Sequence, residues 1–168
     1  GDLTFEDNSA AWRFDDTNIC HGIALADLDN DGDLDVVGNR MNASAWLLRN
    51  EASTPRVMVR LKGAAANTSG VGAKITLRGG AVPTQTQELT SGGKYLSGDH
   101  GARVFAARRD ERAGGMSLEV TWRSGTRSSL SNLQADCIYE VFETGAVKAP
   151  SIVREKGGAP WFIDASDR

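Results

Sequence analysis

The feature that most constrains this chain is a run of aspartates at every second position of one short segment: Asp27, Asp29, Asp31, Asp33 and Asp35. Carboxylates at this density repel one another unless a cation holds them together. Oxygen ligands with flexible geometry favour a hard cation of the size of calcium over zinc or copper, which prefer nitrogen or sulfur. The sequence therefore predicts a calcium-binding loop, and a solvated acidic turn without metal is the alternative.

Each aspartate has an expected role in this loop. A loop that curls around one point presents alternate residues to its centre, so the side chains of Asp27, Asp29 and Asp31 would point inward. Asp33 would offer its backbone carbonyl, and Asp35 would close the site with a carboxylate. All five residues are therefore candidate ligands of one Ca²⁺ ion.

The loop matches only the first half of an EF-hand. The match includes Gly32, which allows the positive φ that a sharp turn needs. An EF-hand has glutamate at its twelfth position, where this chain has Gly38. The flanking segments 22–26 and 36–38 are short apolar runs of the kind that form buried strands. We therefore expect the loop to connect two β-strands.

Two parts of the sequence resemble known families. IALADLDNDGDLDVV at residues 23–37 resembles the calcium loop of an FG-GAP, or VCBS, repeat, the unit that forms blades of integrin-type β-propellers. NTSGVGAKITL at 67–77 and GGKYLS at 92–97 resemble the ASPIC/UnbV domain, which follows such repeats in proteins similar to cartilage acidic protein. The resemblance implies an all-β fold in which one propeller-blade-like unit with a calcium loop packs on an antiparallel β-sandwich or barrel-like domain.

The alternation of apolar and polar residues supports the all-β reading. Period-two alternation is typical of a strand with one buried face, and it is clear at 57–61, 73–77 and 118–122. In the first of these strands Arg56, Met58 and Arg60 fall on the polar face. Further strands are expected at 19–26, 34–37, 45–49, 84–89, 103–107, 126–129 and 137–142, with a single helical turn at 131–134. Short antiparallel strands separated by glycine-rich turns indicate a β-sandwich or barrel-like domain.

The predicted organisation has three parts. Residues 1–52 would form the FG-GAP/VCBS-type repeat unit, 53–144 the ASPIC/UnbV-like domain, and 145–168 a linker and the start of a further repeat. The pattern F-x-D-x-S occurs at residues 5–9 and again at 162–166, which suggests a repeat and a fragment of a larger multidomain chain. A single blade must bury its faces against other structure, and Trp12, Phe14 and Trp46 are the side chains expected to make that contact.

Composition excludes several classes of protein. The net charge is −3 and the acidic loop supplies much of the negative charge, so nothing indicates nucleic-acid binding. No apolar run is long enough to span a bilayer, and residues 1–20 lack the order of a signal peptide. Cys20 and Cys137 are too few for a disulfide framework; they form either one bridge or two buried free thiols.

The function expected from these observations is calcium-dependent binding or scaffolding without catalysis. His21 and His100 have no visible catalytic partners, although a deep cleft that paired Asp99 with His100 would favour an enzyme. Calcium would order residues 27–35, and the location would be secreted, periplasmic or at the cell surface. The expected partner is an extracellular protein or glycan.

The alternative function is a calcium-dependent carbohydrate-binding module of a secreted enzyme. Sugar-binding sites commonly present aromatic rings on an open face. The candidate rings in this chain are Tyr95, Trp122 and Tyr139.

Overall fold

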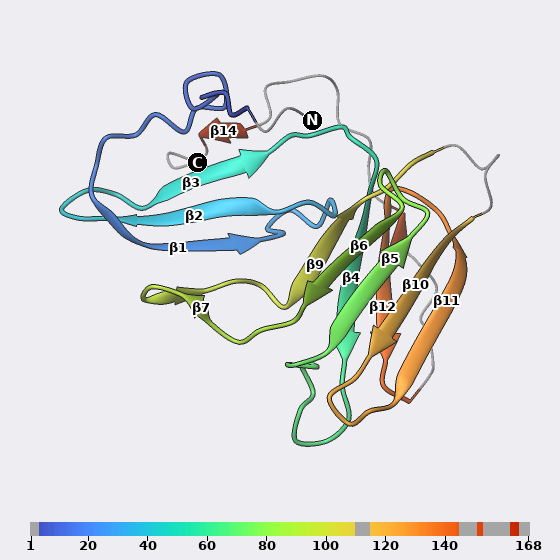
Figure 1. Ribbon diagram of the computed structural model, residues 1–168. Coiled ribbons are helices and arrows are strands. Elements are labelled where there is room, and N and C mark those ends of the chain that lie inside the picture. The colour runs from blue at the N-terminus through green and yellow to red at the C-terminus, as the bar shows by residue number, and fades with distance from the viewer. Residues whose placement is uncertain (1–3, 110–114, 145–150, 153–161, 165–168) are drawn as a thin grey trace.

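A four-stranded antiparallel sheet, here called the first sheet, carries the acidic loop (Figure 1). The computed structural model describes residues 4–109, 115–144, 151–152 and 162–164. The strands of this sheet, in their spatial order, are β1 (Cys20–Ala26), β2 (Asp35–Arg40), β3 (Trp46–Asn50) and β14 (Phe162–Asp164). The loop joins β1 to β2, and Ala26 pairs with Asp35 where the loop begins and ends. The prediction that the loop connects two strands is confirmed.

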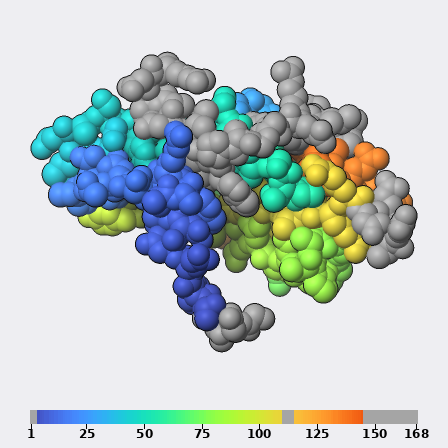
Figure 2. Space-filling model, turned by 90° about the horizontal axis from the view of Figure 1, so that it is seen from above, coloured from blue at the N-terminus to red at the C-terminus, as the bar shows by residue number. Residues whose placement is uncertain are grey.

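The first three residues of the second copy of the F-x-D-x-S pattern form the edge strand of the first sheet. Strand β14 contains its first three residues and pairs antiparallel with β3, with Phe162 opposite Asn50 and Asp164 opposite Leu48. The first copy, at residues 5–9, has no strand structure, and Phe5 is 99% exposed. Figure 2 shows this N-terminal segment, in dark blue, projecting from the body of the molecule. The two copies therefore differ in structure.

Two further sheets pack face to face and form a sandwich (Figure 1). One sheet has the order β11-β10-β5-β6 and the other has the order β13-β12-β4-β9. The strands are β4 (Arg56–Lys62), β5 (Lys74–Arg78), β6 (Thr84–Glu88), β9 (Ala102–Ala106), β10 (Met116–Thr121), β11 (Arg127–Leu133), β12 (Cys137–Phe142) and β13 (Ser151–Ile152). A small hairpin of β7 (Gly93–Lys94) and β8 (Ser97–Gly98) extends from the sandwich to β1.

The sandwich core includes the residues that the alternation predicted to be buried, together with others such as Phe105. Its buried side chains are 6% exposed or less and belong to one cluster. That cluster includes Val57, Val59, Leu61, Ala73, Ile75, Leu77, Phe105, Leu118, Val120 and Trp122. Burial of aliphatic and aromatic groups at this density supplies the main stabilisation of the sandwich.

Side chains join the two sheets of the sandwich at its open edges. Gln85 of β6 donates from Nε2 to the Ala106 carbonyl at 2.6 Å and accepts the Ala106 N–H at 2.9 Å. Gln87 donates in the same way to the Val104 carbonyl at 2.6 Å. At the opposite edge Ser128 donates to the Phe142 carbonyl at 3.1 Å. The described strands do not form a closed barrel. At the open edges, these side-chain hydrogen bonds therefore join the two sheets in place of backbone pairing between strands.

Two details of the sandwich differ from the prediction. Strand β4 pairs antiparallel with β9 but parallel with β12, which single-strand patterns cannot reveal. The helical turn predicted at 131–134 is wrong, because β11 continues to Leu133. Asn132 is an extra residue in the ladder: Ser117 pairs with Ser131 and Met116 with Leu133. With its φ of 58°, Asn132 forms a β-bulge at this position.

The two cysteines are free thiols. Cys20 is exposed on β1, whereas Cys137 is buried in the sandwich core. The disulfide alternative is therefore wrong. Most of the predicted linker lies outside the described residues, as does Trp161; within it, Ser151 and Ile152 pair with the first residues of β12.

The acidic loop of the first sheet lies against the outer face of β4. Arg56 and Met58 were expected on a solvated face, but they are 6% and 0% exposed. Met58 does not belong to the core cluster of the sandwich, and its side chain points to the opposite face from Val57 and Val59. Arg56 and Arg60, on the same face, both contact the acidic loop. The two parts of the molecule therefore meet through this face of β4.

The hairpin β7–β8 and its following residues bind the edge of β1. Ser97 donates its hydroxyl to the Ile23 carbonyl at 2.6 Å, and Leu25 N–H donates to Asp99 Oδ1 at 2.9 Å. The His100 N–H donates to the Leu25 carbonyl at 2.8 Å. These bonds satisfy backbone groups of an edge strand that would otherwise face water.

Trp12, Phe14 and Trp46 were expected to pack the blade-like unit against other structure. Phe14 packs edge-on against Trp46 with ring centroids 5.1 Å apart. Trp12 and Phe14 line a hollow of about 560 Å³ together with Leu25 and Val36. Their described contacts are thus with the first sheet and its N-terminal segment. The junction with the sandwich includes the ion pairs of Arg56 and Arg60 with the loop.

Candidate metal centre

The acidic loop, residues 27–35, folds back on itself through two residues with positive φ. These are Asn30, with φ of 60°, and Gly32, with φ of 83°. The Asp31 N–H donates to Asp27 Oδ1 at 3.0 Å, and the Asp33 N–H donates to Asp31 Oδ1 at 3.1 Å. Carboxylates thus accept hydrogen bonds from the loop's own backbone, and this draws them toward one another.

Three carboxylates meet at one side of the loop. One oxygen from each of Asp27, Asp29 and Asp31 lies within 4.8 Å of the others. Asp27 and Asp31 are buried, and Asp29 is exposed. Calcium binds oxygen at about 2.3–2.6 Å, so oxygens on opposite sides of one ion are about 5 Å apart. The donor set and its spacing therefore fit a calcium ion.

Asp35 connects the loop to the rest of the first sheet. It is fully buried, and its two oxygens accept the N–H groups of Leu28 and Asn50, each at 2.8 Å. Burial raises the pKa of its carboxyl; the two backbone N–H groups oppose that rise, and the charges of Asp29 and Asp31 add to it. Asp35 thus connects the start of the loop, at Leu28, to the end of β3, at Asn50.

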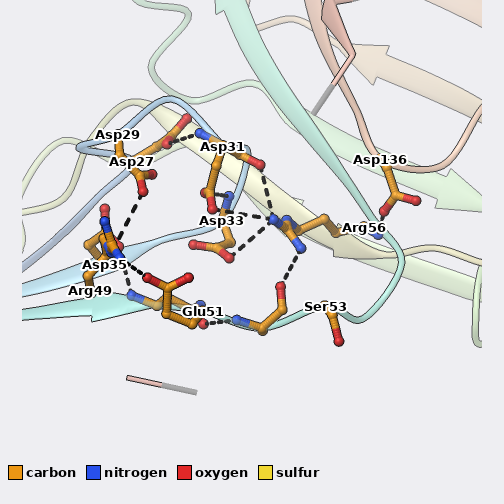
Figure 3. Close-up of polar contacts among 12 residues, drawn as sticks. Asp27, Asp29, Asp31, Asp33, Asp35, Arg49, Glu51, Ser53, Arg56 and Asp136 are labelled. Carbon is orange, nitrogen blue, oxygen red and sulfur yellow. Dashed lines mark hydrogen bonds and ion pairs between the residues drawn. The ribbon is translucent and has the colours of Figure 1, made fainter. Parts of the chain in front are cut away.

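Arg56 of the sandwich lies against the far side of the loop (Figure 3). Its Nη2 donates to the Asp31 carbonyl at 3.0 Å and lies 3.3 Å from Asp33 Oδ2 and 3.6 Å from Asp31 Oδ2. Its Nη1 donates to the Ala52 carbonyl at 2.8 Å. The Asp33 side chain is therefore directed to this guanidinium.

Two further arginines approach the loop. Arg60 Nη2 donates to Asp27 Oδ2 at 2.8 Å and lies 3.3 Å from Asn30 Oδ1. Arg49 pairs with Glu51, and its Nε lies 4.0 Å from Asp29 Oδ2. Sequence reasoning missed all three arginines, although Arg56 and Arg60 stand out as two cations on one face of a strand.

Carboxylates outnumber guanidinium groups among the described contacts of this region. The five loop aspartates and Glu51 are six carboxylates, whereas Arg49, Arg56 and Arg60 provide three guanidinium groups. Like charges repel most strongly among the buried carboxylates of this group, those of Asp27, Asp31, Asp33 and Asp35. A bound divalent cation would remove most of the remaining excess.

The other residues singled out by the sequence do not form a second site. Asp99 binds Lys94 Nζ at 2.8 Å and the Leu25 N–H, and His100 contacts the same strand through its backbone. Of the candidate sugar-binding rings, Trp122 and Tyr139 are buried in the sandwich core, and Tyr95 is 73% exposed. No open aromatic face arises from these three rings.

Comparison with known proteins places the chain in a family. The family model described as ASPIC and UnbV matches residues 63–148, slightly more than half of the chain, and the chain belongs to this family. The match confirms the predicted resemblance for the sandwich. No curated protein matches the chain.

One solved structure shows a limited overall similarity. It is that of a candidate cell adhesion protein from Bacteroides ovatus, with 9% sequence identity and a TM-score of 0.38 over 86% of this chain and 89% of that chain. A similarity at this level does not allow the fold or the role of that protein to be assigned to this chain. Among the described residues, no helix has the length and apolar character of a membrane span.

Proposed function

We propose that this protein is a calcium-binding, non-catalytic module that acts in binding or scaffolding. The observation that carries the proposal is the group of carboxylate oxygens of Asp27, Asp29 and Asp31 within 4.8 Å of one another. The proposal includes the FG-GAP/VCBS nature of the first sheet. A small antiparallel sheet with the acidic loop between its first two strands supports that assignment.

In this proposal the ion closes the loop and neutralises its charge. Asp27, Asp29 and Asp31 would hold it through carboxylates, with Asp33 and Asp35 as further predicted ligands. The hydrogen bonds of Asp35 to Leu28 and Asn50 would transmit the ordering of the loop to β3. Binding to the folded state alone stabilises by RT ln(1 + [L]/Kd), about 2.7 kcal/mol at a hundredfold excess over Kd.

The proposed location is outside the cytoplasm: secreted, periplasmic or at the cell surface. Extracellular modules bind calcium with dissociation constants of about 0.1–1 mM, so calcium at about 1 mM occupies half or more of such sites. The proposed partner is an extracellular protein or glycan. The protein partner is favoured over the carbohydrate-binding alternative because Trp122 and Tyr139 are used in the sandwich core.

Calcium titration of the full chain tests the proposal. Chelator-stripped protein is titrated with CaCl₂ by calorimetry, and melting is followed in chelator and in 5–10 mM calcium, which is about a five- to hundredfold excess over such dissociation constants. We expect calcium to raise the melting temperature by several degrees, and Asp29→Asn to remove both the binding heat and this rise.

Asp15→Asn is the matched control, since Asp15 is an exposed aspartate outside the loop. It should leave calcium binding unchanged. Identical melting in chelator and calcium, without binding heat, would overturn the proposal.

A further inference from the structure

Asp27 already forms an ion pair with Arg60, a residue of the sandwich. Its side chain is 0% exposed, and both of its oxygens are engaged. Oδ1 accepts the Asp31 N–H at 3.0 Å, and Oδ2 accepts Arg60 Nη2 at 2.8 Å. A metal ion that uses Asp27 must therefore share an oxygen with one of these groups or displace it.

Arg60 and Arg56 differ in how easily they could leave the loop. Arg56 is 8% exposed in its side chain, and its donors reach the carbonyls of Asp31 and Ala52 as well as carboxylates. The Arg60 side chain is 28% exposed, and its described contacts with the loop are with Asp27 and Asn30. Arg60 can thus turn toward water, whereas Arg56 supports the backbone of the loop.

We propose that Arg60 is the resident counter-cation of Asp27 and competes with calcium for it, so that filling of the loop is coupled to docking of the sandwich on the first sheet. This inference rests on the proposed function and adds its regulation. Without the ion, Arg60 compensates the buried carboxylate and holds the two parts together. With the ion bound, the same carboxylate serves the metal and the arginine contact weakens.

The competition has a definite sign. Arg60 brings a positive charge next to the ion, which lowers calcium affinity by repulsion, and it occupies a ligand oxygen. Removing Arg60 should therefore tighten calcium binding. In the absence of calcium, the same change should destabilise the protein, because the buried Asp27 carboxylate loses the compensating charge of Arg60. A purely supporting role would give the opposite result, because losing an outer partner of a ligand weakens metal binding.

The experiment compares the wild type with Arg60→Gln and Arg60→Lys, each as the full chain. Calcium alone is titrated by calorimetry, and melting is measured in chelator and in saturating calcium. We expect Arg60→Gln to bind calcium about tenfold or more tightly than the wild type, the scale of losing a hydrogen bond between charged groups. Its melting temperature should be lowered clearly in chelator and much less in calcium. Arg60→Lys should lie between the two proteins.

Arg127→Gln is the control, because Arg127 forms an exposed ion pair with Glu119 within the sandwich at 3.9 Å. It should change neither affinity nor the effect of calcium on melting. A second comparison needs no metal: in chelator, Asp27→Asn, Arg60→Gln and the double variant should be non-additive, since both substitutions remove one pair.

The outcomes separate this inference from the proposed function. Weaker calcium binding by Arg60→Gln overturns the competition while the proposed function stands. If Arg60→Gln binds calcium and the wild type does not, the competition is supported, but the proposal that the wild-type protein functions by binding calcium is overturned. Absence of binding by both proteins overturns both proposals, and full additivity in chelator overturns the docking role of Arg60.

Discussion

The first sheet and the sandwich are stabilised by different forces. In the sandwich, strand β10 alternates buried and half-buried residues, and its inward side chains join one continuous apolar cluster. In the first sheet, β1 has no fully buried residue, and the buried groups of its loop are carboxylates. The sandwich therefore depends on apolar burial, whereas the loop depends on charge compensation.

This difference indicates that the two parts respond to different changes. Apolar burial is insensitive to small changes in calcium or pH, while a cluster of aspartates responds to both. Because β4 carries Val57 and Val59 into the core and Arg60 to the loop, the same strand serves both parts. Damage to the sandwich should therefore reach the first sheet, but the reverse effect should be weaker.

The largest expected effect is that of Phe105→Ala. Phe105 is 1% exposed in the sandwich core, and truncation of a buried phenylalanine costs about 3–5 kcal/mol. Because the sandwich supplies Arg56 and Arg60, we expect both parts to unfold together in urea at a lower midpoint. Far-UV circular dichroism and amide exchange of residues 20–50 would measure this.

Leu48→Ala is the counterpart in the first sheet, where Leu48 is also 1% exposed. It should accelerate amide exchange in β1–β3 and leave β10 protected. Equal loss of protection in β10 would show that the two parts form one cooperative unit and would contradict the comparison.

A smaller effect is expected from Gln85→Ala at the edge of the sandwich. This change removes two exposed hydrogen bonds to the Ala106 backbone, and a typical intramolecular hydrogen bond contributes about 0.5–1.5 kcal/mol. Urea denaturation would measure the loss, with Glu88→Ala as an exposed substitution on the same strand. If both variants match the wild type, the side-chain bridge contributes nothing to stability.

The smallest effect concerns Glu143 and pH. The Ala64 N–H, together with the Ser124 hydroxyl, lowers the pKa of the Glu143 carboxyl. A lowered pKa stabilises the fold above the ordinary value of 4.5, and this contribution is lost as pH falls through the lowered pKa. Glu143→Gln should therefore melt slightly below the wild type at pH 7 and equal to it in strong acid. A constant difference at all pH values would contradict this assignment.

The sequence predicted what local pattern determines. Alternation identified Val57, Ile75 and Val120 as core residues, and the aspartate spacing placed a loop between two strands. Features that depend on distant residues were missed. Arg60 looked solvated because its partner, Asp27, is far away in sequence, and the bulge at Asn132 depends on the pairing of β11 with β10.

The parallel pairing of β4 with β12 has a consequence for synthesis on the ribosome. Arg56 N–H bonds Asp136 Oδ1, a contact between residues 80 positions apart. Strand β4 cannot complete its sheet until that later segment has emerged from the ribosome. The acidic loop is therefore synthesised before the sheet that holds Arg56 and Arg60 is complete. During that interval, cations in solution can compensate the charge of the loop aspartates.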